Sequence, residues 1–250
     1  MPRSLCFLVV LLGLAGPSAH AQSPTTVPAP SATVPDANHP WTPEDYRAAA
    51  TAWTNAPAGT LPRRGSGAAG EMFARLVNPE NLASLSVPTT PLPTRLALSL
   101  AYADGASKLL AIYLTAFNKG EPLGPEVLAL SAHVCAVAAA EWSLVDVFQK
   151  GLDKSAPDYE TRMKGLDRMR EGTATVISGV LVTLTETDAY GKDALTVFAN
   201  QLQATFPALM HHVPETSQAS LGLRLETQAG AEPPGAYHDA LMALLATVKP

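Results

Sequence analysis

The chain has 250 residues, a formal net charge of −5 at pH 7, 47% hydrophobic residues and 16% charged residues. These values are typical of a globular protein with a modest surface charge, and the length is sufficient for one hydrophobic core. The acidic residues outnumber the basic ones by 22 to 17, and the basic residues form no stripe, which argues against a nucleic-acid partner and against anionic membrane surfaces.

The first 21 residues have the three parts of an export signal peptide. Arg3 supplies a positive start, residues 5–15 are apolar, and residues 19–21 (Ala-His-Ala) place small side chains where a signal peptidase cleaves. We therefore expect cleavage after Ala21 and an exported mature chain, in the periplasm or the medium. The alternative is a membrane anchor, but the apolar run has about 12 residues and a bilayer needs roughly 20. We expect no transmembrane span in the mature chain.

Cleavage would leave the mature chain with one cysteine. The sequence contains two, Cys6 and Cys135, and Cys6 lies inside the signal peptide. A single cysteine excludes an intramolecular disulfide and also excludes zinc sites built on clusters of cysteines. Small apolar residues surround Cys135 in the sequence, so we expect it to be a buried, unreactive side chain.

Residues 22–40 differ in composition from the rest of the chain. Pro, Ser, Thr and Ala dominate this segment, and its large apolar residues are two valines. Such a segment cannot bury enough apolar surface to offset the entropy lost on ordering, so we expect an extended, mobile linker. The folded part should then be one helical domain over residues 41–250.

The remaining sequence predicts an all-α fold, an irregular helical bundle of about five to seven helices. Thr42 is a helix cap, Pro43 suits the first helical position, and acidic residues follow in the first turn. Capping signals and apolar periodicity predict helices over residues 43–55, 71–77, 94–119, 124–150, 155–187, 192–212 and 235–248, with a short helical turn after Asn78. Pro207 should kink the helix that contains it.

Two segments have an ambiguous interpretation. Residues 215–229 contain leucines that alternate with other residues, a pattern that is compatible with a short strand as well as with a helix. Residues 56–70 are rich in Gly and Pro and contain Arg63-Arg64, so they indicate either a mobile, functional loop with a protease-sensitive dibasic site or an ordinary solvated loop.

Three glycines in the predicted helix 155–187 are spaced by seven residues, at Gly165, Gly172 and Gly179. This spacing is close to two helical turns, so the glycines share one stripe. Each costs about 1 kcal/mol of helix propensity relative to Ala, which suggests that something lies close to the backbone. The preceding helix carries a complementary seam of alanines, at positions 129, 132, 136 and 139.

These two small-residue surfaces predict a long central antiparallel helical hairpin. Folding the chain at the turn near residues 151–157 places Gly172 opposite Cys135 and Gly165 opposite Trp142. Small residues facing each other would bring the helix axes to about 8–10 Å or closer. The functional alternative is a narrow groove in which a flat ligand lies on the glycines.

A few polar residues within apolar helices are candidates for chemistry. His133 and Glu141 are eight residues apart, about 80° around a helix axis, so they could converge in a cavity as an acid–base pair. They are equally compatible with a satisfied buried pair. His211 and His212 are adjacent and point about 100° apart on a helix, so we expect an interaction with the helix dipole and no metal site.

Trp41, Tyr46 and Trp53 form an aromatic cluster near the start of the predicted domain. We expect these side chains to dock the first helix on the core, and the alternative is a stacking surface for a ligand.

No recognised catalytic or cofactor motif occurs in the sequence, including His-Glu-x-x-His, Gly-x-Ser-x-Gly, the P-loop and the dinucleotide glycine motif. We expect no cofactor. The favoured hypothesis is an exported, non-enzymatic helical protein that binds a protein partner or an apolar ligand. A second is an enzyme whose site combines His133, Glu141 and a residue of the 56–70 loop. A third is a peripheral membrane protein that uses the Ala/Gly hairpin.

Overall fold

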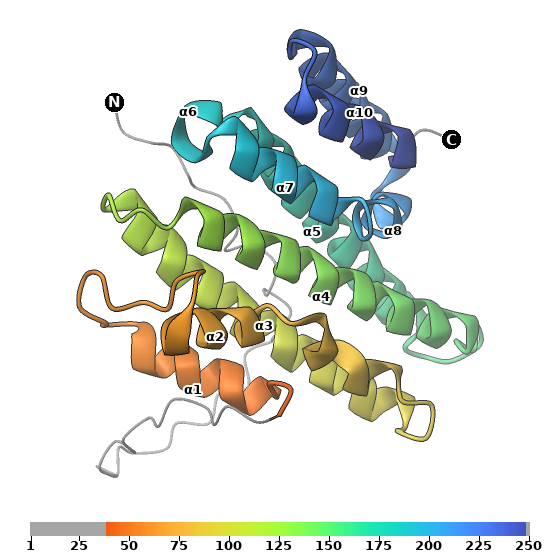
Figure 1. Cartoon of the computed structure of the whole chain (residues 1–250). Helices are drawn as coiled ribbons and strands as arrows, with labels where there is room; N and C mark the ends of the chain where they lie inside the picture. The colour runs from red at the N-terminus through yellow and green to blue at the C-terminus, as the bar shows by residue number, and fades with distance from the viewer. Residues whose placement is uncertain (1–38, 249–250) are drawn as a thin grey trace.

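The computed structural model describes residues 39–248, and every regular element in that range is a helix (Figure 1). The elements are α1 (Pro43–Trp53), α2 (Gly67–Leu76), the 3-10 helix η2 (Pro79–Ser86), α3 (Leu92–Asn118), α4 (Gly124–Lys150), α5 (Tyr159–Thr185), α6 (Thr187–Tyr190), α7 (Lys192–Leu202), α8 (Phe206–His212), α9 (Glu215–Ala231) and α10 (Ala236–Val248). The all-α prediction is therefore confirmed for these residues. The predicted signal peptide and nearly all of the predicted linker lie outside them.

The expected number of five to seven helices is too low, because residues 39–248 contain ten α-helices. The predicted helix 192–212 is in fact two helices, and Pro207 lies in the first turn of α8 instead of kinking a longer helix. Proline has no N–H and suits a helix start, where that donor would have no intrahelical partner. The predicted helix 155–187 likewise ends at Thr185, and α6 follows it until Gly191, whose φ of +78° separates α6 from α7.

Residues 215–231 form the helix α9, so the suggested strand in this segment is wrong. Leu221 and Leu225 are buried four residues apart, whereas Leu223 is 63% exposed. This is the helical period, in which positions i and i+4 share a face. The alternation of leucines in the sequence was misleading because its middle member faces solvent.

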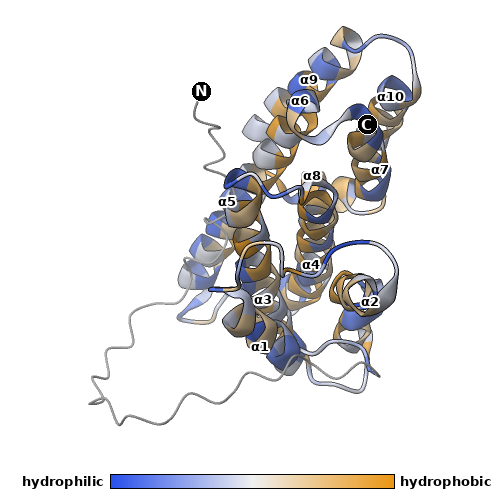
Figure 2. Cartoon of the chain, turned by 60° about the vertical axis from the view of Figure 1, so that its left-hand side comes forward, coloured by the Kyte–Doolittle hydropathy of each residue, from blue (hydrophilic) through white to orange (hydrophobic). Residues whose placement is uncertain are grey.

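α4 is the central helix of the molecule (Figure 1). α3 and η2 pack on it from one side, and α1 packs on α3; α7 and α8 pack on it from another side, and α9 and α10 cover α5, α7 and α8. Figure 2 shows hydrophobic residues concentrated along α3 and α4. The buried hydrophobic side chains of both groups form one connected core.

Among residues 39–248, α4 is the one helix that is long and apolar enough to cross a membrane. Within its most apolar window, 56% of the residues are buried inside the molecule. A core helix of a bundle passes the same test of length and composition, because it is apolar on several faces. Packing against α3, α7 and α8 thus accounts for the composition of α4.

The long hairpin partner of α4 is α3, whereas the sequence pattern predicted α5. α4 and α5 make only a narrow contact, in which the indole N–H of Trp142 donates to the hydroxyl of Thr173 over 2.9 Å. Trp142 therefore meets Thr173, and the predicted register that paired it with Gly165 is wrong. A buried indole N–H needs an acceptor, which a threonine hydroxyl supplies and a glycine side chain cannot.

The glycine stripe is open at one end and buried at the other, since Gly165 has free space around it and Gly179 is buried. A Cβ atom added at Gly165 would meet nothing within 4 Å. The first half of α5 is rich in charged, exposed residues, and most of its buried residues lie between Thr173 and Leu184. The small-on-small packing expected along the whole hairpin is therefore absent at Gly165, where nothing lies within 4 Å of an added Cβ atom, whereas the neighbouring Leu166 is buried in the core.

Candidate functional site

His133 lies in a buried hydrogen-bond network that joins α4 to the N-terminal helices. Its Nε2 is 2.7 Å from the Tyr46 hydroxyl, which donates to the carbonyl of Leu76 over 2.7 Å. Because that hydroxyl has one proton, Nε2 of His133 carries the hydrogen and donates to it. Asn81 also donates to this hydroxyl over 2.9 Å, and its side-chain oxygen accepts from the backbone N–H of Trp41 over 2.7 Å.

The surroundings of His133 keep it neutral. Burial lowers its pKa to about 4, because the charged imidazolium would lose hydration without gaining a carboxylate partner. Its donor nitrogen is engaged with Tyr46, which lies on α1. The geometry is that of a buried histidine hydrogen-bonded to Tyr46, and it differs from the buried His133–Glu141 pair that was one interpretation of the sequence.

Glu141 does not provide the partner of His133, since Tyr46 occupies that position. Glu141 lies two turns further along α4, where burial raises the pKa of its carboxyl to about 7. Such a value would suit a general acid or base. Neither residue, however, lines any of the grooves described below.

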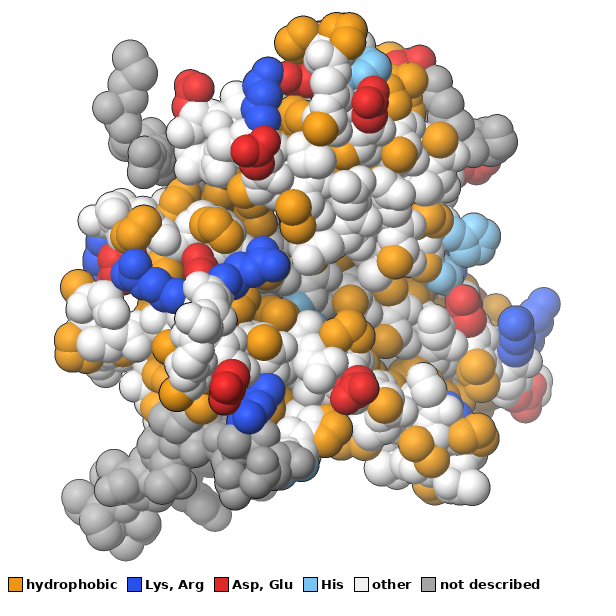
Figure 3. Space-filling model, in the orientation of Figure 1, with side chains coloured by type: hydrophobic (Ala, Val, Ile, Leu, Met, Phe, Trp, Pro, Cys, Tyr) orange, Lys and Arg blue, Asp and Glu red, His pale blue; other side chains and the backbone are white. Residues whose placement is uncertain are grey.

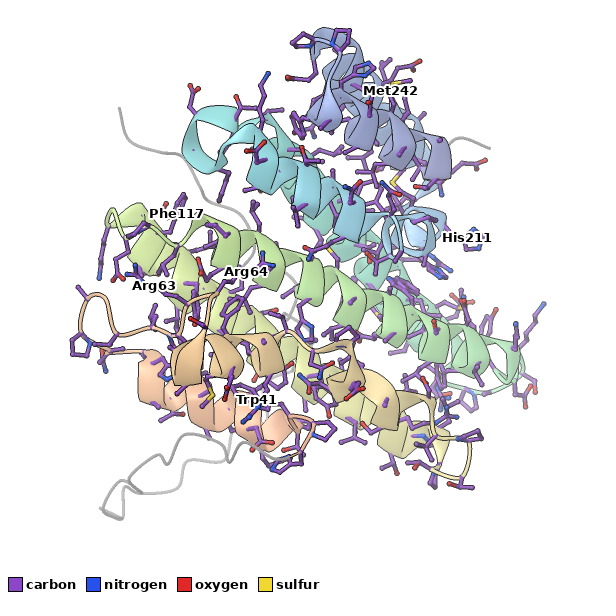
Figure 4. The ribbon with its side chains drawn as sticks, in the orientation of Figure 1. Trp41, Arg63, Arg64, Phe117, His211 and Met242 are labelled. Carbon is purple, nitrogen blue, oxygen red and sulfur yellow. The ribbon has the colours of Figure 1, made fainter. Side chains whose placement is uncertain are left out.

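The loop between α1 and α2 is held against the junction of α3 and α4 (Figure 4). The guanidinium of Arg63 is 3.2 Å from a carboxylate oxygen of Glu121, which also accepts from the backbone N–H of Gly59 over 3.0 Å. The backbone N–H of Arg64 donates to the buried Glu126 over 2.7 Å. The dibasic segment is therefore fixed through the side chain of Arg63 and the backbone of Arg64.

A further hydrogen bond holds the same loop, from the hydroxyl of Tyr113 to the carbonyl of Pro62 over 2.8 Å. Figure 3 shows basic side chains at the place where Figure 4 labels Arg63 and Arg64, with an acidic group beside them. The contacts of the loop are made to the start of α4, and His133 contacts α1 and not this loop. The structure does not bring the three components of the suggested enzyme site together through these contacts.

The aromatic residues at the start of the described chain dock α1, as expected. Trp41, Tyr46 and Trp53 are all buried, and Trp41 packs edge-on against Tyr46 with ring centroids 5.4 Å apart. The ligand-stacking alternative would need exposed rings, but Trp41 and Tyr46 are fully buried, and Trp53 is 8% exposed beside the groove between α1 and α3.

His212 packs against α4 instead of forming a pair with His211 for a metal ion. Its ring stacks on Trp142 with the centroids 4.2 Å apart, and its Nε2 is 3.5 Å from a carboxylate oxygen of Asp146. Burial lowers the pKa of His212, and the charge of Asp146 acts in the opposite direction. Within residues 39–248, no group of three or more His, Cys, Asp or Glu side chains is arranged to hold a metal ion.

Gly179 and Cys135 line the same small cavity between α4 and α5, with a volume of about 20 Å³. This is room for about one water molecule and not for an organic ligand. Cys135 is buried, and burial raises the pKa of its thiol to about 12. A thiol in this state is not a nucleophile, which agrees with the unreactive role predicted for it.

The sequence analysis missed the glycine that does allow a close approach between helices. A Cβ atom at Gly105 in α3 would lie 2.5 Å from the Cβ of Tyr46. Tyr46 can therefore reach His133 and Asn81 only because position 105 has no side chain. A glycine inside the long apolar helix 94–119 was the signal that could have revealed this contact.

The most spacious of the grooves described here lies between α5, α9 and α10, and we call it the α5–α9–α10 groove. Its volume is about 510 Å³. Figure 2 shows α9 beside the end of α5, near α6. The residues that line it are Leu181, Leu184, Thr185, Thr187, Leu223, Arg224, Thr227, Gln228, Ala231, Glu232 and Tyr237.

The α5–α9–α10 groove has an apolar floor and a polar rim. Leu181 and Leu184 are buried beneath it, and the exposed Leu223 stands at its edge. The hydroxyl of Tyr237 donates to the carbonyl of Leu184, and Glu232 forms an ion pair with Lys192 of α7. These polar groups are occupied by partners within the chain.

Two other grooves are smaller. One lies between α1 and α3, where Trp53, Leu61 and Ile112 contribute to a volume of about 270 Å³. The other lies between α4 and α7, where Arg64 and Val197 contribute to a volume of about 250 Å³.

No protein-family model, curated protein sequence or solved structure matches the chain. Function must then be inferred from the residues themselves. The His133 network is buried among protein groups, and the α4–α5 cavity holds one water at most. The α5–α9–α10 groove combines open volume, apolar surface and a nearby charge, so it is the candidate functional site.

Proposed function

We propose that this chain is an exported, non-enzymatic helical protein that binds an apolar small molecule in the α5–α9–α10 groove. The observation that carries the proposal is the open volume of about 510 Å³ above two buried leucines, Leu181 and Leu184. Ligand sites of proteins have volumes of about 300–1,000 Å³ and are lined mainly by apolar side chains.

Leu223 supports the same interpretation. It is 63% exposed at the edge of the groove, in a position of α9 where a polar side chain would cost the fold little stability. A ligand lying against Leu223 would remove apolar surface from water, which stabilises a complex by about 25 cal/mol per Å². The exposed leucine is then part of the binding surface.

The polar groups of the groove favour binding over catalysis. Tyr237 and Glu232 are engaged by Leu184, Gln228 and Lys192. A catalytic acid or base must be within reach of a substrate proton. The alternative enzyme site, built on His133 and Glu141, has less support because His133 is a buried donor to Tyr46.

Export is the second part of the proposal. The three-part pattern of residues 1–21 supports cleavage after Ala21 and a mature chain in the periplasm or the medium. A binding protein in such a compartment meets ligands from outside the cell. The membrane alternative has less support, because the apolar α4 is already packed against α3, α7 and α8.

The test uses N-phenyl-1-naphthylamine, a neutral apolar fluorophore, titrated into the mature protein. We expect saturable binding, and Leu223→Asp should weaken it about tenfold by placing a charge against the apolar probe. Met242→Asp is the matched control, because Met242 is also an exposed apolar residue but lies on α10 outside the groove lining. Absence of saturable binding, or equal effects of the two substitutions, would refute the proposed site.

A further inference from the structure

We infer that the ligand of the α5–α9–α10 groove is an anionic amphiphile, with a carboxylate bound by Arg224 and an apolar tail over the leucines. This inference rests on the proposed function, since it concerns the same groove. Arg224 lines the groove from α9, directly after Leu223 in the chain. The structure thus places a cation next to the apolar surface.

The guanidinium of Arg224 is oriented by a neutral partner. Its Nη1 donates to the hydroxyl of Ser178 on α5 over 2.8 Å. A guanidinium has five N–H donors in a rigid fork, so the bond to Ser178 leaves donors for a ligand. The fork matches a carboxylate, which it can bind through two parallel, charge-assisted hydrogen bonds.

The other charges around the groove are compatible with an anionic ligand. Glu232, the acidic residue in the groove lining, is paired with Lys192. Glu226, two residues from Arg224 on α9, is not part of the groove lining. The positive charge of Arg224 therefore acts at the groove, whereas the charge of Glu232 is balanced within the protein.

The arrangement of apolar and charged groups sets the class of ligand. Leu181 and Leu184 form a floor that suits a hydrocarbon tail, and the exposed Arg224 lines the same groove. A fully apolar ligand would gain nothing from the guanidinium, and a cationic ligand would be repelled by it. A fatty acid of medium chain length has both required parts.

The experiment compares dodecanoate, 1-dodecanol and dodecyltrimethylammonium, each below its micelle-forming concentration, by calorimetric titration into the mature protein. These ligands share a tail and differ in head-group charge. We expect dodecanoate to bind about tenfold more tightly than dodecanol, and the cation to bind most weakly. Arg224→Gln should weaken dodecanoate binding to about the level of dodecanol, so that the preference for the anionic ligand is lost.

Arg168→Gln is the control for a general loss of positive charge, because Arg168 is an exposed residue of α5 outside the groove lining. It should leave the preference for dodecanoate intact. Equal binding of dodecanoate and dodecanol by the unaltered protein would overturn the anionic inference while leaving the apolar site in place. Failure of all three to bind would overturn the site and the inference together.

Discussion

At the scale of single residues, burial changes the chemistry of two side chains of α4 in opposite directions. His133 is kept neutral, with a pKa of about 4, whereas the pKa of Glu141 rises to about 7. Both shifts have the same cause, the loss of hydration of the charged form. Lowering the pH therefore destabilises the fold through His133 and stabilises it through Glu141.

The first prediction concerns the acid sensitivity that His133 causes. Its pKa is about 6.5 in an unfolded chain and about 4 in the fold. As the pH falls, His133 therefore binds a proton in the unfolded state before it does so in the folded state. The contribution of neutral His133 to the free energy of unfolding is complete above pH 6.5 and is lost as the pH falls towards 4. The full loss corresponds to about 3 kcal/mol.

His133→Gln tests this prediction, because a glutamine amide can still donate to Tyr46 but does not titrate. Urea unfolding at pH 7 and at pH 4.5 should show a smaller loss of stability for the variant than for the unaltered protein. The other titrating groups, Glu141 included, are common to both proteins and cancel in the comparison. An equal loss in both would mean that His133 is not the buried neutral donor described above.

At the scale of helices, the close approach of α1 and α3 depends on a single glycine. Gly105→Ala would place a Cβ atom 2.5 Å from the Cβ of Tyr46, so one helix must move and the Tyr46–His133 hydrogen bond must lengthen. We expect a loss of about 2–4 kcal/mol in the free energy of unfolding.

Gly165→Ala is the matched control in α5, since an added Cβ there would meet nothing within 4 Å. It should stabilise the protein by up to about 1 kcal/mol, because alanine has the higher helix propensity. Chemical denaturation of both variants gives the comparison. If Gly105→Ala stabilised the protein, or Gly165→Ala strongly destabilised it, the close contact between helices would lie at the glycine stripe of α5 and not at Gly105.

The same pair of glycines illustrates what sequence could and could not establish. Local signals found most helices: Thr42 caps α1 as expected, and the structure adds a capping box with Asp45. Local signals do not determine which helices pack together, because the alanine seam on α4 could pack against several neighbouring helices. The contact of His133 with Tyr46, 87 residues away in the chain, leaves no periodic signal. The groove likewise depends on how α9 and α10 pack on α5.

The loop between α1 and α2 gives a second prediction at this scale. A protease needs an extended, mobile substrate, but Arg64 is held by its backbone bond to Glu126 and Arg63 by Glu121. We expect trypsin to cleave slowly at this dibasic segment. Glu126→Gln weakens the bond to Arg64 by replacing a charged acceptor with a neutral one, so cleavage there should accelerate severalfold.

Lys154 provides the internal reference for this digestion. It lies in the exposed connection between α4 and α5, far in sequence from Glu126, so its cleavage rate should not change in the variant. Mass spectrometry of the fragments reports both rates in one sample. Rapid cleavage after Arg63 or Arg64 in the unaltered protein would show that the loop opens freely in spite of these bonds.

At the scale of the whole molecule, α4 connects the two groups of helices. It contacts α3 and η2 on one side and α7 and α8 on another. Insertion of α4 into a bilayer would separate it from all of these partners and expose their apolar faces. We therefore expect the mature protein to remain in the aqueous phase when it is partitioned against a detergent.

The last prediction concerns export, and it uses the full chain expressed in a bacterium with a general secretion system. The intact mass of the exported protein should correspond to a chain that begins at Gln22, because the small residues 19–21 precede that position. Ala21→Phe places a large side chain where the peptidase needs a small one, so this variant should keep its first 21 residues and accumulate as a precursor. A control substitution in the linker, Thr26→Ala, should be processed normally. An exported mass that still includes residues 1–21, or partition of the processed protein into detergent, would instead identify the apolar start of the chain or α4 as a membrane anchor.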